Sequence, residues 1–97
     1  MTFDEFKATL ADPSPPNLLP ALRALWHDAH GDWALAHSIA QDIGDRTGAW
    51  VHAYLHRKEG DPENAAYWYR RADRPVAEDA LPAEWERIVT AVLRGSV

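Results

Sequence analysis

The sequence contains no cysteine. This absence excludes disulfide bonds, thiolate metal sites and a cysteine nucleophile, and it makes a reducing compartment the simplest interpretation. Long apolar runs are also lacking, since none approaches the about 20 residues that a membrane-spanning helix needs. The first residues, MTFDEFKATLADP, have neither the basic nor the apolar segment of a secretory signal. We therefore expect a cytoplasmic protein without a membrane partner.

An excess of positive charge is lacking as well. The formal net charge is −5 at pH 7, whereas binding to nucleic-acid phosphates needs a basic surface, so we expect no nucleic-acid partner. The charge is unevenly distributed, because residues 1–48 hold seven acids and three bases while residues 49–97 hold eight acids and seven bases. Positive charge therefore collects in the second half of the chain.

No segment alternates apolar and polar residues over a useful length, so we expect no β-sheet. Apolar residues instead recur at helical spacing in six segments, which are bounded by proline, glycine and capping residues. The predicted helices span residues 3–11, 18–29, 33–43, 47–59, 62–73 and 82–93. With 46% hydrophobic and 26% charged residues, the composition is that of a globular chain. The sequence thus predicts a single all-α domain over residues 1–97.

Two segments of the sequence match when one is shifted by 29 residues. Small residues recur where the helices of a hairpin approach closely, and Gly-Asp recurs at the turn, where Gly can adopt a positive φ and Asp can cap the next helix. The matched pairs are Ala24 and Ala53, His27 and His56, Gly31 and Gly60, Asp32 and Asp61, and Ala36 and Ala65. The pattern predicts two consecutive helical hairpins.

The second segment resembles the tetratricopeptide repeat family, whose helix-turn-helix units stack into a curved solenoid. The residues that carry this resemblance are Gly60, Asp61, Ala65, Trp68, Tyr69 and Ala72. It implies two stacked units at about 18–44 and 47–74, in a right-handed array flanked by N-terminal and C-terminal capping helices. The stretches HRKEGD and YWYRRA also resemble small bacterial proteins, a resemblance that implies no function.

Basic and aromatic residues around the second hairpin are candidates for a binding surface. In the resembling family the first helix of each pair lines an inner groove, and two cations beside two aromatic rings there suit a carboxylate or an acidic peptide. The groove cations Arg57 and Lys58, like the outward-facing residues of the next helix, have no evident structural role. The candidate partner-binding residues are Trp50, Tyr54, Arg57, Lys58, Tyr67, Arg70 and Arg71.

This surface favours a helical-repeat interaction module that binds a protein or peptide partner, or a second copy of itself, without a cofactor. A solvated, salt-bridged face is the alternative interpretation of the same charges. No enzyme signature accompanies them, since the sequence lacks a phosphate-cradling glycine loop, a GxSxG elbow and an HExxH motif. We therefore assign no catalytic residue.

His52 and His56 suggest a different function, because their i, i+4 spacing lets two imidazole rings reach one metal ion. His27, the repeat equivalent of His56, is a candidate third ligand. On this hypothesis the chain binds a metal or a small anion, with a catalytic role left open, through these histidines and neighbouring arginines. The competing interpretation is structural: His27 and His56 fill a partly buried slot near the turn, bonded to backbone or carboxylate groups.

Overall fold

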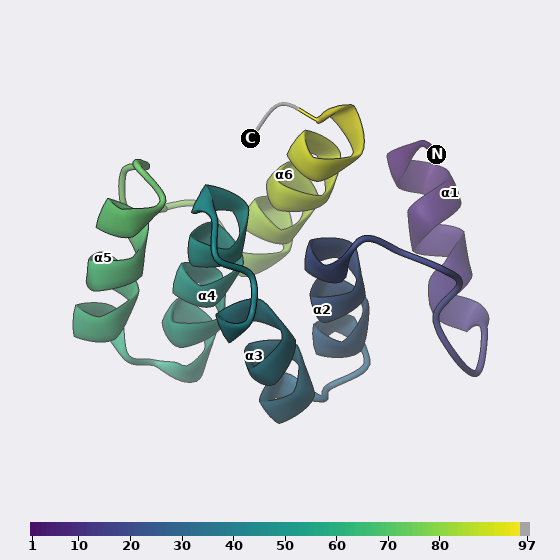
Figure 1. Cartoon of the computed structure of the whole chain (residues 1–97), viewed down its shortest axis with the longest axis horizontal. Coiled ribbons are helices and arrows are strands. Elements are labelled where there is room, and N and C mark those ends of the chain that lie inside the picture. Colours follow the sequence, from purple (N-terminus) through teal and green to yellow (C-terminus); the bar gives the residue numbers. More distant parts are fainter. Residues whose placement is uncertain (96–97) are drawn as a thin grey trace.

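The structure, a computed structural model, describes residues 1–95. Over this range it is all-helical and contains no strand, which confirms the predicted fold class (Figure 1). In this part of the chain the elements are α1 (Phe3–Ala8), the 3₁₀ helix η1 (Thr9–Ala11), α2 (Pro20–Ala29), α3 (Trp33–Gln41), α4 (Arg46–Glu59), α5 (Pro62–Arg71) and α6 (Leu81–Arg94). None of the helices in the described range is long and apolar enough to cross a bilayer.

Capping residues set the boundaries of most helices. Thr2 accepts the backbone N–H of Glu5 at 3.1 Å, and the Glu5 carboxylate accepts the N–H of Thr2 at 2.8 Å, so the predicted capping box is present. Asp45 caps α4, which for that reason begins one residue before the predicted start. The helix predicted from residue 18 begins instead at Pro20, because proline suits a first helical position whose N–H has no partner.

The two hairpin turns have the same geometry. Gly31 and Gly60 have φ values of 81° and 90°, a region that a β-carbon disfavours. In the first turn the N–H of Asp32 donates to the carbonyl of His27 at 3.0 Å, and in the second the N–H of Asp61 donates to that of His56 at 2.9 Å. The 29-residue match in the sequence therefore corresponds to a repeated turn structure.

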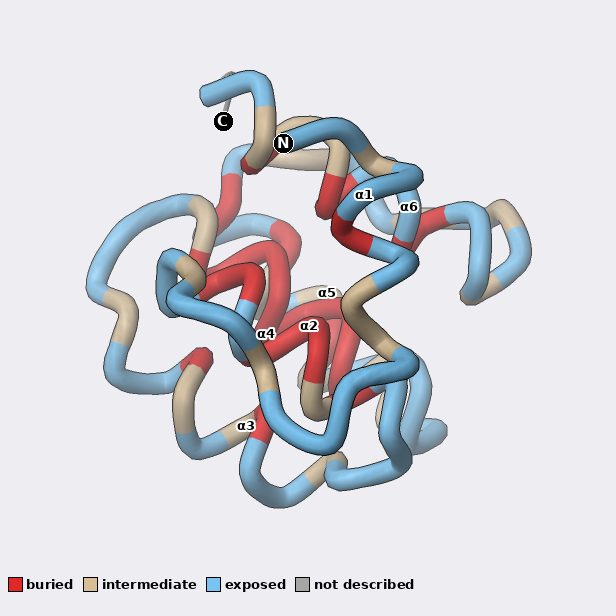
Figure 2. The backbone as a smooth tube through the Cα atoms, turned by 90° about the vertical axis from the view of Figure 1, so that its right-hand side faces the viewer, coloured by how far each residue is buried: buried red, intermediate tan, exposed pale blue. Residues whose placement is uncertain are grey.

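The helices pack around α4. Adjacent helices pair as α2 with α3 and α4 with α5, and α3 also contacts α4. Helix α6 lies against both α2 and α4, and α1 packs on α6 (Figure 1). Every residue of α4 from Gly48 to His56 is buried, and Figure 2 shows the buried residues concentrated where α2, α4 and α5 lie. The groove expected along α2 and α4 is therefore covered by the chain's own α6.

Close packing of α3 can be tested at Ala36, which has no exposed surface. Replacement by leucine adds three methylene-sized groups to a filled space and should lower the free energy of unfolding by about 2 kcal/mol. The matched control is Ala34→Leu on the exposed side of the same helix, which should change stability little. Urea unfolding followed by circular dichroism measures both, and equal midpoints for the two variants would contradict this packing.

Candidate functional site

Three histidines from two helices converge beside the second hairpin. His37 comes from α3, and His52 and His56 come from successive turns of α4. One ring nitrogen of each histidine lies within 4.8 Å of a ring nitrogen of the other two. The structure thus brings His52 and His56 together as predicted. The third histidine beside them is His37, not the predicted His27. His27 lies on α2, contacts the ring of Trp26, and belongs to neither group of potential metal ligands found in the described residues.

Two tryptophans hold the rings of this three-histidine cluster in place. The Trp33 ring stacks on His37 with centroids 4.8 Å apart, and its indole N–H donates to the Leu55 carbonyl of α4 at 2.8 Å. From α5, Trp68 stacks on His52 with centroids 3.9 Å apart and an interplanar angle of 11°. Trp33 also meets His56 edge-on, with ring centroids 6.0 Å apart. The cluster is therefore built from three helices, with an indole ring against each of its three imidazoles.

Hydrogen bonding leaves ring nitrogens of the cluster available. Nδ1 of His56 donates to the Glu59 carboxylate at 2.7 Å, so its Nε2 can act as an acceptor or a ligand. In residues 1–95 no hydrogen bond reaches a ring nitrogen of His37 or His52. No buried side-chain nitrogen or oxygen in the described residues lacks a hydrogen-bond partner, so the ring nitrogens of His37 and His52 remain in contact with solvent and are free to accept a ligand. The structural interpretation offered for His27 and His56 describes His56, which is buried and bonded to the Glu59 carboxylate, whereas no hydrogen bond to the His27 ring is found in residues 1–95.

The electrostatic surroundings keep two of these imidazoles neutral. Burial, and then the neighbouring rings of His37 and His56, lower the pKa of His52 from its ordinary 6.5 to about 4. Burial and His56 also lower the pKa of His37. Neutral imidazole is the form that coordinates a metal, so neither ring has to lose a proton at neutral pH.

The spacing of the cluster is close to that of a tetrahedral site. Nitrogen ligands about 2.1 Å from zinc lie about 3.4 Å apart. The present separations do not exceed 4.8 Å, so the nitrogens would have to approach one another by at most about 1.4 Å to share an ion. Glu59 would remain bonded to the far nitrogen of His56 and orient that ring.

The aromatic residues predicted to line a partner groove are buried inside the fold. The Trp50 indole N–H donates to Glu84 of α6 at 3.2 Å, and the Tyr54 hydroxyl donates to Asp28 of α2 at 3.2 Å. Only 2% of Trp50 and 3% of Tyr54 is exposed. Burial, followed by the charge of Asp28, raises the pKa of Tyr54, so its hydroxyl stays protonated and continues to donate. Neither ring offers a free face to a partner in this structure.

The expectation that Arg57 and Lys58 have no structural role is wrong. Arg57 donates to the fully buried carboxylate of Glu84 at 2.7 Å and to the backbone carbonyl of Asp79. Lys58 donates to the buried carboxylate of Asp28 at 3.0 Å. Both cations neutralise acids that α2 and α6 bring against α4, and those acids lie about 30 residues away in the chain, beyond the range of any local pattern.

The other three predicted partner-binding residues lie on the exposed side of α5. Tyr67 is 43% exposed, and its hydroxyl accepts from the Arg71 guanidinium at 3.0 Å. Arg71 also lies over the Trp68 ring, with its central carbon 5.2 Å from the ring centroid. Arg70 is exposed and makes no ion pair within the described residues. This surface borders Trp68 and so adjoins the three-histidine cluster.

Fold and cluster together define a small all-α protein with a cluster of three histidines between α3 and α4. No protein-family model, curated protein or solved structure matches this chain. The function is therefore inferred from the geometry and chemistry of its own residues.

Proposed function

We propose that this protein binds one divalent transition-metal ion, such as zinc, through His37, His52 and His56. The observation that carries the proposal is the convergence of three imidazole nitrogens within 4.8 Å. Imidazole ligands suit zinc, copper and nickel, whereas magnesium and calcium prefer oxygen. The neutral state of His37 and His52, and the lack of other partners for their nitrogens in residues 1–95, support the same ligand class.

Three protein ligands leave the fourth position of a tetrahedral ion open to water or to another molecule. Structural zinc sites are closed by four protein ligands, whereas sites that bind or activate a small molecule keep a position free. His37 is half-buried, which favours access from solvent on its side of the cluster. We therefore infer an ion that retains an exchangeable ligand.

A second candidate function is recognition of an acidic peptide or protein at Tyr67, Arg70 and Arg71. It is supported by their exposure and by the ring and guanidinium contacts that hold Tyr67 and Arg71 together. Tyrosine and arginine are the residue types that most often anchor interfaces. Because none of the three supplies a ring nitrogen to the cluster, this candidate is independent of metal binding.

Metal binding is tested with tag-free protein stripped by a chelator and titrated with Zn²⁺ against a chromophoric competitor. We expect one ion per chain, and His37→Gln, His52→Gln and His56→Gln should each weaken binding by at least about tenfold, because each removes one of three ligands. His27→Gln is the matched control and should bind as the native chain does. Circular dichroism of each apo variant establishes that it is folded.

Two results would contradict the proposal. One is a native protein that retains no ion under these conditions. The other is a loss of affinity in His27→Gln as large as in the three cluster variants, since His27 lies outside the cluster on α2. Parallel titrations with Cu²⁺ and Ni²⁺ identify which ion of this class the site prefers.

A further inference from the structure

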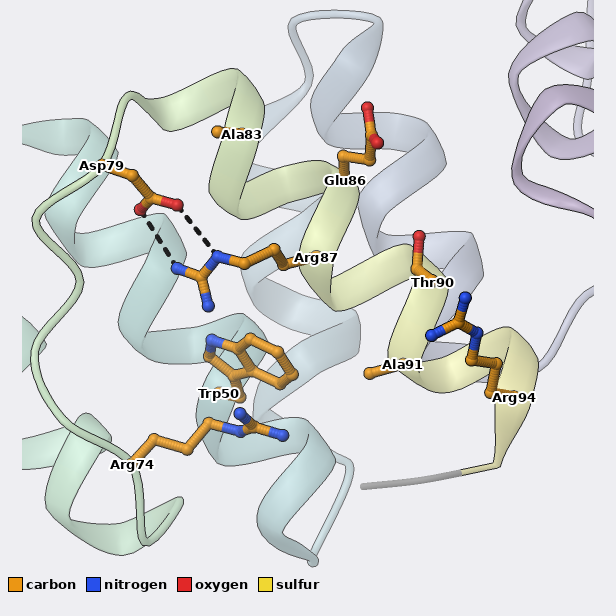
Figure 3. A pocket seen from close by; sticks show the side chains of 9 residues that line it. All are labelled: Trp50, Arg74, Asp79, Ala83, Glu86, Arg87, Thr90, Ala91 and Arg94. Carbon is orange, nitrogen blue, oxygen red and sulfur yellow. Dashed lines mark hydrogen bonds and ion pairs between the residues drawn. The ribbon is translucent and has the colours of Figure 1, made fainter.

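A polar pocket lies on the other side of α4 from the histidines. Trp50 and His52 are two positions apart on the helix, which turns them about 200° from each other around its axis. The Trp50 side faces α6 and the segment between α5 and α6, where a pocket of about 570 Å³ opens (Figure 3). Its lining residues are Trp50, Arg74, Asp79, Ala83, Glu86, Arg87, Thr90, Ala91 and Arg94.

Three guanidinium groups gather in this pocket. Arg87 is occupied, because it makes a bidentate pair with Asp79 at 2.9 and 3.0 Å. Neither Arg74 nor Arg94 forms an ion pair with any residue in the described part of the chain. In Figure 3 Glu86 extends away from Trp50 and from these two arginines. Within residues 1–95, two of the three cations therefore have no anionic partner.

Trp50 fixes one of these free cations in position. The central carbon of Arg74 lies 3.5 Å from the centroid of the Trp50 ring, a close cation–π contact. Arg87 approaches the same ring at 5.9 Å, and Figure 3 shows the ring between the two guanidinium groups. Burial, and then the charge of Arg87, lower the pKa of Arg74. A partly buried cation beside another cation is stabilised when an anion binds.

Helix α6 adds two further groups to the same side. Arg87, Thr90 and Arg94 follow each other at spacings of three and four residues, which puts them on one face of the helix. All three line the pocket, and Thr90 comes between the two arginines along the helix; in Figure 3 its hydroxyl points to the same side of α6 as the Glu86 carboxylate. Arginine forks and a hydroxyl donor are the groups that hold the oxygens of a phosphate.

We propose that Arg74, Thr90 and Arg94 form a binding site for a phosphate group, carried by a small phosphorylated molecule. Two guanidinium groups that form no ion pair within residues 1–95 match the double negative charge of a phosphate monoester better than the single charge of a carboxylate. The pocket exceeds the volume of a phosphate alone and lies within the range of small-molecule sites, about 300 to 1,000 Å³. This site is independent of the three-histidine cluster and of metal binding.

The test is isothermal titration of the full chain with glycerol phosphate, inorganic phosphate and acetate, each at constant ionic strength set with chloride. We expect saturable binding of glycerol phosphate. Arg74→Gln and Arg94→Gln should each weaken it by at least about tenfold, since each removes a charge-assisted hydrogen bond. Arg23→Gln, an exposed arginine of α2, is the control and should leave it unchanged.

Arg94 is exposed, so its replacement tests the proposal even if loss of the Arg74 contact to Trp50 disturbs the fold. Tighter binding of glycerol phosphate than of inorganic phosphate supports a phosphorylated molecule as the ligand. Binding of inorganic phosphate with no gain from the ester overturns that assignment in favour of the free ion. Absence of saturable binding, equal affinity for acetate, or unchanged affinity in Arg94→Gln would overturn the phosphate site itself.

Discussion

Replacing Arg57 by methionine is expected to lower the free energy of unfolding by about 3 kcal/mol, the lower end for breaking a buried ion pair. Glu84 has no exposed surface, and Arg57 is its only charged hydrogen-bond partner among the described residues. Trp50 and Tyr69 would continue to donate, at 3.2 and 2.6 Å, but neither carries a compensating charge. The side chain of Arg57 is 21% exposed, which is why the lower end of the range applies.

The control for this prediction is Arg70→Met, the same change at an exposed arginine of α5, which should be nearly neutral. Combining Arg57→Met with Glu84→Gln removes the unpaired charge and should recover part of the loss. Urea midpoints give the free energies. If Arg57→Met and Arg70→Met have the same midpoint as the native chain, the buried pair does not stabilise the fold.

Gly48→Ala is expected to destabilise the protein by about 3 kcal/mol, the upper end for overpacking. A β-carbon at Gly48 would overlap the backbone oxygen of Ile43 and would lie 2.6 Å from the Ile43 β-carbon. Backbone atoms cannot rotate away as a flexible side chain can, so the start of α4 would have to shift. That shift would also disturb the cap in which Asp45 accepts the Gly48 N–H at 3.1 Å.

Gly44 provides the matched control because it lies four residues before Gly48, in the connection between α3 and α4. A β-carbon there would meet nothing within 4 Å, and its φ is not in the left-handed region. Gly44→Ala should therefore be neutral or slightly stabilising, by about 0.5 kcal/mol, through a less flexible unfolded chain. Thermal melts compare the two variants. Similar losses at both positions would contradict the close approach of Ile43 and Gly48.

Local sequence signals were sufficient to predict the helices and turns. Asp32 and Asp61 accept N–H groups three residues ahead, and Gly31 and Gly60 have the positive φ values that a hairpin turn uses. The position of α6 was not predictable in this way. It depends on which apolar surfaces meet, and on pairs such as Glu84 with Arg57, 27 residues apart, for which no local pattern exists.

The candidate metal site was predicted in part. The spacing of His52 and His56 identified two members because both lie on one helix. His37 was missed because the repeat match only relates positions in one hairpin to positions in the other. It does not show which helix of the first hairpin faces His52 and His56. That match suggested His27 on α2, whereas α3 is the neighbour that brings a ring to His52 and His56. The Arg74 pocket was missed for a similar reason, since it combines α4, α6 and the segment between α5 and α6.

X-ray absorption spectroscopy of the zinc-loaded protein tests the metal proposal most directly. If His37, His52 and His56 bind the ion, the spectrum will show three nitrogen ligands at about 2.0 to 2.1 Å together with the outer scattering of imidazole rings. His37→Gln should reduce that outer scattering by about one third, whereas His27→Gln should leave it unchanged. A shell of oxygen ligands without imidazole scattering, or a spectrum unaffected by His37→Gln, would contradict a three-histidine metal centre.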